Sequence, residues 1–143
     1  MKRSFAVGLV LMLITLTGCV GKQLSYQDVQ PQEGMASIYV YRPTNFLNSA
    51  ETMILEINGV ESGLLSHGFY LHSFTEPGNA DLLLKKNVFP YNEYGSIALK
   101  DIKAGQNYYI KADPIALAGF DMILMDAKIG RQEASATKLF INE

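Results

Sequence analysis

Residues 55–78 read LEINGVESGLLSHGFYLHSFTEPG, and this stretch decides the expected fold. Asn58-Gly59 stands between two runs of apolar and β-forming residues, which is the strongest short-range signal for a two-residue β-hairpin. Pro77-Gly78 has the composition of a tight turn. The strands that these signals predict are 52–57, 60–65, 68–74 and 80–85.

The same pattern continues on both sides of this stretch. Residues 36–42 (ASIYVYR) are rich in β-formers and stop at Pro43, and Lys103-Ala104-Gly105 separates two further runs at 96–102 and 106–112. Short strands with turns between them predict an all-β, mainly antiparallel sandwich. The remaining expected elements are a buried strand at 121–127, one short helix at 132–138 and a last strand or tail at 139–142.

Size and composition restrict the classes of protein to which the chain can belong. Its 143 residues fit one domain, and its single cysteine allows no internal disulfide, so the fold has to rest on a hydrophobic core. The formal net charge is -2, and loss of Lys2 and Arg3 with a leader would bring it to -4. A weakly acidic surface does not attract polyanions, so nucleic acid is not an expected partner.

The N-terminus has the composition of a secretory leader. Lys2 and Arg3 precede an apolar run at 5–14, and a basic start followed by an apolar, helical segment of this length is typical of a signal peptide. An uncleaved transmembrane anchor is the alternative. The apolar stretch is shorter than the roughly 20 residues that cross a bilayer, which favours the signal peptide.

The leader ends in Leu16-Thr17-Gly18-Cys19, which resembles the lipobox of bacterial lipoproteins. The resemblance implies a diacylglyceryl thioether on the Cys19 sulfur and cleavage of the Gly18–Cys19 bond. Two or more acyl chains attach a protein stably to a membrane. Val20 stands where Asp would favour retention in the inner membrane, so the resemblance implies the outer membrane, on the side that faces the periplasm.

These features divide the chain into three parts. Residues 1–18 are the expected signal peptide, 19–34 the lipidated N-terminus with a polar tether, and 35–143 the sandwich domain. A tether over 20–34 could extend to about 45 Å, and its middle part, 24–29, could pack on the domain.

The hairpin with Gly63 and the Pro77-Gly78 turn resembles the PEGA-type β-sandwich module of bacterial envelope proteins. The wider chain is similar to a family of small bacterial lipoproteins built on such a module, through residues 36–43 and 104–110. The Thr-Pro step that often follows the PEGA hairpin is replaced here by Leu64-Leu65-Ser66, so the match is one of architecture. The resemblance implies an Ig-like sandwich and brings no catalytic residues.

Two groups of residues are candidates for a binding surface. Tyr39 and Tyr41 lie on one face of the strand at 36–42, and with Arg42 they would bind peptide or sugar if exposed, whereas packed tyrosines would only stabilise the sheet. The apolar segment 114–120, with Leu117 and Phe120, is either a buried bend or an exposed loop that contacts a membrane or a partner.

No catalytic, metal or cofactor site emerges from the sequence. His67 and His72 are five residues apart, which would place them on opposite faces of a continuous strand, and no nucleophile motif of the G-x-S-x-G type is present. We therefore expect a non-catalytic binding or structural module of the envelope, with possible partners among envelope proteins. A small-ligand or glycan-binding lipoprotein is the alternative, and an envelope enzyme is a third reading.

Overall fold

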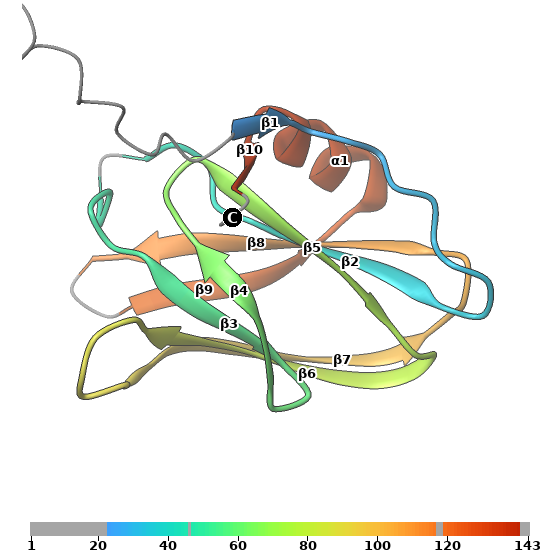
Figure 1. Cartoon of the computed structure of the whole chain (residues 1–143), viewed down its shortest axis with the longest axis horizontal. Helices are drawn as coiled ribbons and strands as arrows, with labels where there is room; N and C mark the ends of the chain where they lie inside the picture. The colour runs from blue at the N-terminus through green and yellow to red at the C-terminus, as the bar shows by residue number, and fades with distance from the viewer. Residues whose placement is uncertain (1–22, 46, 117–118, 141–143) are drawn as a thin grey trace, which may run out of the picture.

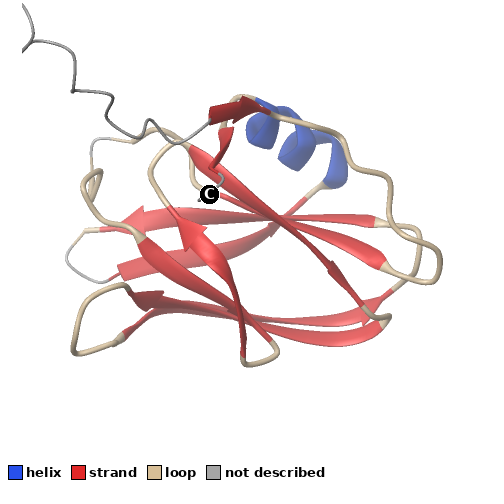
Figure 2. Ribbon diagram, in the orientation of Figure 1, coloured by secondary structure: helices blue, strands red, loops and turns tan. Residues whose placement is uncertain are grey.

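A computed structural model describes residues 23–45, 47–116 and 119–140 of the chain, and the expected leader helix and Cys19 lie outside these residues. Two β-sheets pack face to face, and one helix lies on the outer face of the larger sheet (Figures 1 and 2). The predicted all-β sandwich with one short helix near the C-terminus is confirmed.

Six strands form one sheet and four form the other. The larger sheet contains, in spatial order, β1 (Gln23–Ser25), β10 (Lys138–Phe140), β5 (Phe69–Thr75), β2 (Ala36–Tyr41), β8 (Asn107–Ile115) and β9 (Gly119–Met125). The smaller sheet contains β4 (Val60–Leu65), β3 (Met53–Ile57), β6 (Gly78–Lys86) and β7 (Glu93–Ile102). The pairs β10–β5 and β2–β8 are parallel, and the other pairs are antiparallel.

The hairpin that the sequence indicated most clearly is present. Asn58 and Gly59 both have positive φ angles, 52° and 77°, as a primed two-residue turn requires. The Asn58 side chain also accepts a hydrogen bond from the amide of Asp81 on the neighbouring strand β6 (2.9 Å). The turn is therefore fixed both by its own backbone and by the next strand.

Strand β2 is buried along its whole length because both of its faces are covered. Its residues Ala36, Ile38 and Val40 join the core between the two sheets. Its alternate residues Tyr39 and Tyr41 join a second cluster on the outer face of the larger sheet. The molecule thus has three layers, with α1 (Ala127–Ser135) and the N-terminal segment as the outermost one (Figure 1).

Two glycines let the sheets approach each other along one edge. A Cβ atom on Gly95 of β7 would lie 2.2 Å from the Phe120 carbonyl oxygen, and one on Gly119 of β9 would lie 2.4 Å from the Tyr94 carbonyl oxygen. No side chain fits at either position without a shift of backbone. The pair brings the first residues of β7 next to the first residues of β9.

Two expectations for the C-terminal part were wrong. The helix spans Ala127–Ser135, not 132–138, because the Asp126 side chain caps it and accepts hydrogen bonds from the amides of Lys128 (2.9 Å) and Ile129 (3.2 Å). The strand expected at 121–127 is β9, which starts earlier and is not buried throughout. It lies at the sheet edge, where Ile123 and Leu124 are exposed.

Candidate functional site

Two features of the described chain go beyond what a sandwich needs. The first is the tyrosine cluster on the outer face of the larger sheet, which we define as Tyr26, Tyr39, Tyr41, Tyr70 and Tyr109. The rings of Tyr39 and Tyr109 stack with their centroids 5.0 Å apart, and Tyr26 lies 5.2 Å from Tyr70. Four of these side chains are almost completely buried, and Tyr26 is half-buried.

The hydroxyl groups of this cluster hold the N-terminal segment on the sheet. We call residues 23–29 the N-terminal strap. The amide of Gln27 donates to the Tyr70 hydroxyl (3.1 Å), and the amide of Val29 donates to the Tyr39 hydroxyl (2.8 Å). The expectation that part of the tether packs on the domain is thus met, and the freely extended length is shorter than the 45 Å expected above.

Helix α1 covers the rest of the cluster at very short range. A Cβ atom on Gly130 would lie 2.3 Å from the Cβ of Tyr109, so only glycine lets the helix come this close. Tyr41 donates a hydrogen bond to Glu133 of the helix (2.9 Å), and Lys111 pairs with the same carboxylate (3.5 Å). The helix and the strap together exclude solvent from the tyrosine rings.

Burial makes ionisation of the cluster's hydroxyl groups less favourable. It raises the pKa of Tyr26, Tyr39, Tyr41 and Tyr70 above the ordinary tyrosine value, so these hydroxyls remain neutral. His72 packs on Tyr39 with ring centroids 4.6 Å apart, and its Nε2 lies 3.1 Å from the Ser37 hydroxyl. Burial lowers the pKa of His72, which favours its neutral form.

The second feature is the end of the sandwich where the β2–β3, β6–β7 and β8–β9 connections lie, which we call the loop end (Figure 1). Arg42 organises it, although its side chain is fully buried. The guanidinium donates to the backbone carbonyls of Glu51 (2.6 Å) and Asn48, and it lies 4.7 Å from the centre of the Phe120 ring. Tyr94 joins the same group by donating to the Glu51 carboxylate (3.1 Å).

A pocket of about 290 Å³ lies at this end, between the β2–β3 and β6–β7 connections. Its polar lining comes from Glu51, Thr52, Lys86, Asn87 and Tyr94. Its volume is at the lower limit of the roughly 300–1,000 Å³ that small-molecule sites occupy. The pocket could therefore accept only a small polar group or one edge of a larger ligand.

Exposed apolar side chains are found on the same loop end as this pocket, and one of them, Val88, lines it. Phe89 is 84% exposed and packs edge to face on Tyr91, which is itself 60% exposed. Val88 is exposed on the same connection. Leu47 is exposed on the β2–β3 connection, and Ile115 is exposed at the end of β8. We call these five residues the apolar tip.

The residues predicted as a binding surface are placed differently. Tyr39, Tyr41 and Arg42 are 0% exposed and Phe120 is 3% exposed, so none of the four presents a surface to a ligand. The strap and α1 cover the tyrosines, and the close contact of β7 with β9 covers Phe120. Leu117 lies outside the described residues. The apolar tip was missed as a site, although the sequence marks 88–95 as an aromatic, proline-containing connection.

The two histidines do not form a joint site. His67 lies in the turn before β5, where its Nε2 accepts a hydrogen bond from the Asn45 amide (2.7 Å), while His72 belongs to the tyrosine cluster. Within the described ranges, no group of three His, Cys, Asp or Glu side chains is arranged to hold a metal ion. Among the same residues, no helix has the length and apolar character needed to cross a bilayer.

Comparison with known protein families assigns the chain to one of them. Residues 32–119, more than half of the chain, match the family described as protein of unknown function, DUF2846. The matched region runs from the residues before β2 to the start of β9, so it includes the loop end and most of the tyrosine cluster. No curated protein matches the chain. The chain belongs to the DUF2846 family.

Proposed function

We propose that the mature protein begins at Cys19, carries lipid on that cysteine, and serves as a non-catalytic binding or structural module of the bacterial envelope. The lipobox-like Leu16-Thr17-Gly18-Cys19, at the end of a leader of the right length, is the observation that carries the proposal. Cys19 is also the single cysteine of the chain, so its thiol has no disulfide partner within it. The outer membrane, facing the periplasm, is the proposed location because Val20 follows the cysteine.

The packing of the N-terminal strap supports this proposal. Three tyrosine hydroxyls hold the first described residues of the chain on the sheet. If Cys19 is anchored in a membrane, any movement of the domain away from the membrane pulls on the residues that follow Cys19. The strap attaches that chain along the sheet, so the load is distributed over Tyr70, Tyr39 and Tyr109.

Substitution of Cys19 tests the anchor. Cys19→Ser should abolish palmitate labelling and leave an uncleaved precursor of higher mass in a Gram-negative host. Val20→Asp is the matched control, since it should retain the label and the cleavage but move the protein to the inner-membrane fraction. Cleavage of Cys19→Ser at the same bond, with unchanged membrane attachment, would show that the proposal is wrong.

A small-ligand or glycan-binding lipoprotein is the second candidate, and the pocket at the loop end favours it. Carboxylate, ammonium and hydroxyl groups from Glu51, Lys86 and Tyr94 converge there. Titration of the 15N-labelled domain with the disaccharide of N-acetylglucosamine should then shift the amide signals of these residues. A spectrum without changes at millimolar disaccharide would exclude this sugar as the ligand and leave the non-catalytic module as the better reading.

A further inference from the structure

We infer that the loop end of the sandwich inserts its apolar tip into the interfacial region of the bilayer. The inference rests on the lipid anchor proposed above, and it adds an orientation and a second membrane contact. The partner of the apolar tip is therefore lipid, which the tip contacts at the level of the headgroups and the upper acyl chains.

The distribution of exposed apolar side chains is the first argument. Nine large apolar side chains are exposed among the described residues, and five of them form the apolar tip at one end. The other four are spread over the β3–β4 hairpin, β9 and α1. A concentration of this kind is unusual on a surface that meets only water and marks a contact site.

The strand register is the second argument, because it places β1 in the half of the larger sheet that is nearer the loop end. Strand β1 pairs with β10, whose residues Lys138 and Leu139 lie opposite Phe69 and Tyr70 at the start of β5. Tyr70 in turn lies opposite Tyr41, the last residue of β2 before the loop end. Strand β1 thus lies in the half of the sheet that is nearer the loop end, with Ser25 closer to that end than Gln23.

The length of the connecting chain is the third argument. Cys19 precedes Gln23, the first residue of β1, by four positions. A fully extended chain of four residues spans at most about 14 Å. A lipid on Cys19 therefore keeps Gln23 within about 14 Å of the lipidated residue, so the domain has no long tether between the anchor and its first strand.

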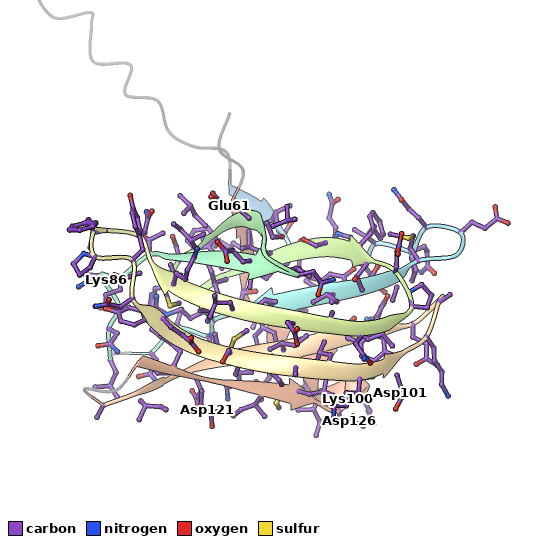
Figure 3. The ribbon with its side chains drawn as sticks, turned by 90° about the horizontal axis from the view of Figure 1, so that it is seen from below. Glu61, Lys86, Lys100, Asp101, Asp121 and Asp126 are labelled. Carbon is purple, nitrogen blue, oxygen red and sulfur yellow. The ribbon has the colours of Figure 1, made fainter. Side chains whose placement is uncertain are left out.

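The chemistry of the tip fits the membrane interface. Phe89 and Tyr91 are aromatic, and the interfacial region is where tyrosine places its ring in the apolar layer and its hydroxyl near water. Charge contributes little, because Lys86, which is labelled in Figure 3, lines the same pocket as Glu51, and Glu93 begins β7 at the other end of this connection. Zwitterionic lipid is consequently sufficient, and anionic lipid is not required.

Hydrogen bonds fix the two connections that carry most of the tip, and Arg42 provides those of the β2–β3 connection. Its bonds to the Asn48 and Glu51 carbonyls hold the β2–β3 connection, and the Tyr94–Glu51 bond joins that connection to the start of β7. The β6–β7 connection, which carries Phe89, is closed by its own backbone bond from the Lys86 amide to the Asn92 carbonyl (2.9 Å). Side chains on connections that are already ordered lose less conformational entropy when they insert.

The chain has no tryptophan, so a single substitution introduces a specific fluorescent reporter. Phe89→Trp should be prepared as the lipidated full chain and reconstituted in phosphatidylcholine vesicles. We expect a blue-shifted emission and strong quenching when the acyl chains of the lipid carry bromine. Val60→Trp is the matched control, because Val60 is 69% exposed and shares a groove with Met35 and Glu76, away from the tip.

The outcomes separate this inference from the anchor. Quenching of Trp in Phe89→Trp but not in Val60→Trp supports insertion of the tip. Lipidated protein that stays with the vesicles but gives unquenched emission from Phe89→Trp, or equal quenching in both variants, overturns the inference and leaves the anchor standing. Absence of lipid on Cys19, shown by mass spectrometry, overturns the anchor itself.

Discussion

Val29 and Tyr39 exchange two hydrogen bonds across ten residues of chain. The Val29 amide donates to the Tyr39 hydroxyl at 2.8 Å, and that hydroxyl donates to the Val29 carbonyl at 3.2 Å. A side chain on the central strand β2 thereby replaces the strand neighbour that the Val29 backbone lacks. The strap is thus part of the folded domain, although the family match begins only at residue 32.

Removal of the Tyr39 hydroxyl tests this relationship. Tyr39→Phe keeps the ring in the cluster but leaves both backbone groups of Val29 without a partner. We expect a loss of about 1–2 kcal/mol in the free energy of unfolding and faster hydrogen exchange at the Val29 amide. Tyr94→Phe, which removes one hydroxyl at the loop end, is the control and should not change exchange at Val29. Equal exchange in both variants would contradict the role of Tyr39.

Replacement of Gly130 by alanine should destabilise the protein. Alanine is the better helix former by roughly 0.5–1 kcal/mol, but its Cβ would lie 2.3 Å from the Cβ of Tyr109. We expect Gly130→Ala to lower the free energy of unfolding by about 1–3 kcal/mol, measured by thermal denaturation. Gln132→Ala, at an exposed position of the same helix, should change it by less than about 0.5 kcal/mol. A more stable Gly130→Ala would show that the helix can move away from the sheet at little cost.

The strands could be predicted because their signals are local. Asn58-Gly59 fixes a hairpin through its own φ angles, and the alternation of Ile38 and Val40 with Tyr39 and Tyr41 places each side chain on its face. The helix could not be bounded in the same way. Its buried positions include Gly130 and Ala134, small residues that serve close approach to the sheet and give no apolar periodicity.

The candidate site was harder to predict because exposure depends on what covers a residue. Tyr39 and Tyr41 are covered by the strap and by α1, which lie before and far after them in sequence. Phe89 and Tyr91, in contrast, contact each other and are otherwise mostly exposed. Composition is similar in both cases, so only the tertiary arrangement separates the packed aromatic residues from the exposed ones.

His72 should make stability sensitive to mild acid. Burial lowers its pKa in the folded protein below the unfolded value of about 6.5, so the unfolded chain binds the proton more readily. The contribution of neutral His72 to the free energy of unfolding is therefore fully present above about pH 6.5. It is lost as the pH falls from this value through the pKa of His72 in the folded protein. His72→Gln should flatten the pH dependence of the urea midpoint in this window. His67→Gln serves as the control at a turn position, and a profile unchanged by His72→Gln would exclude His72 as the source.

Replacement of Arg42 by lysine should destabilise the protein although the charge is kept. Lysine keeps the charge but carries its donors on a single nitrogen, so it cannot reproduce the planar fork whose two nitrogens donate separately to the Asn48 and Glu51 carbonyls. We expect Arg42→Lys to lower the free energy of unfolding by about 1–3 kcal/mol and to open the β2–β3 connection to proteolysis. Arg131→Lys is the matched control, because its ion pair with Asp28 is partly exposed and should be worth less than about 1 kcal/mol. If both variants lost the same stability, the guanidinium would not be what holds the loop end. The two substitutions can also be combined in one chain. Weaker quenching by brominated lipid in Arg42→Lys, Phe89→Trp than in Phe89→Trp alone would show that the bonds of Arg42 support insertion of the tip.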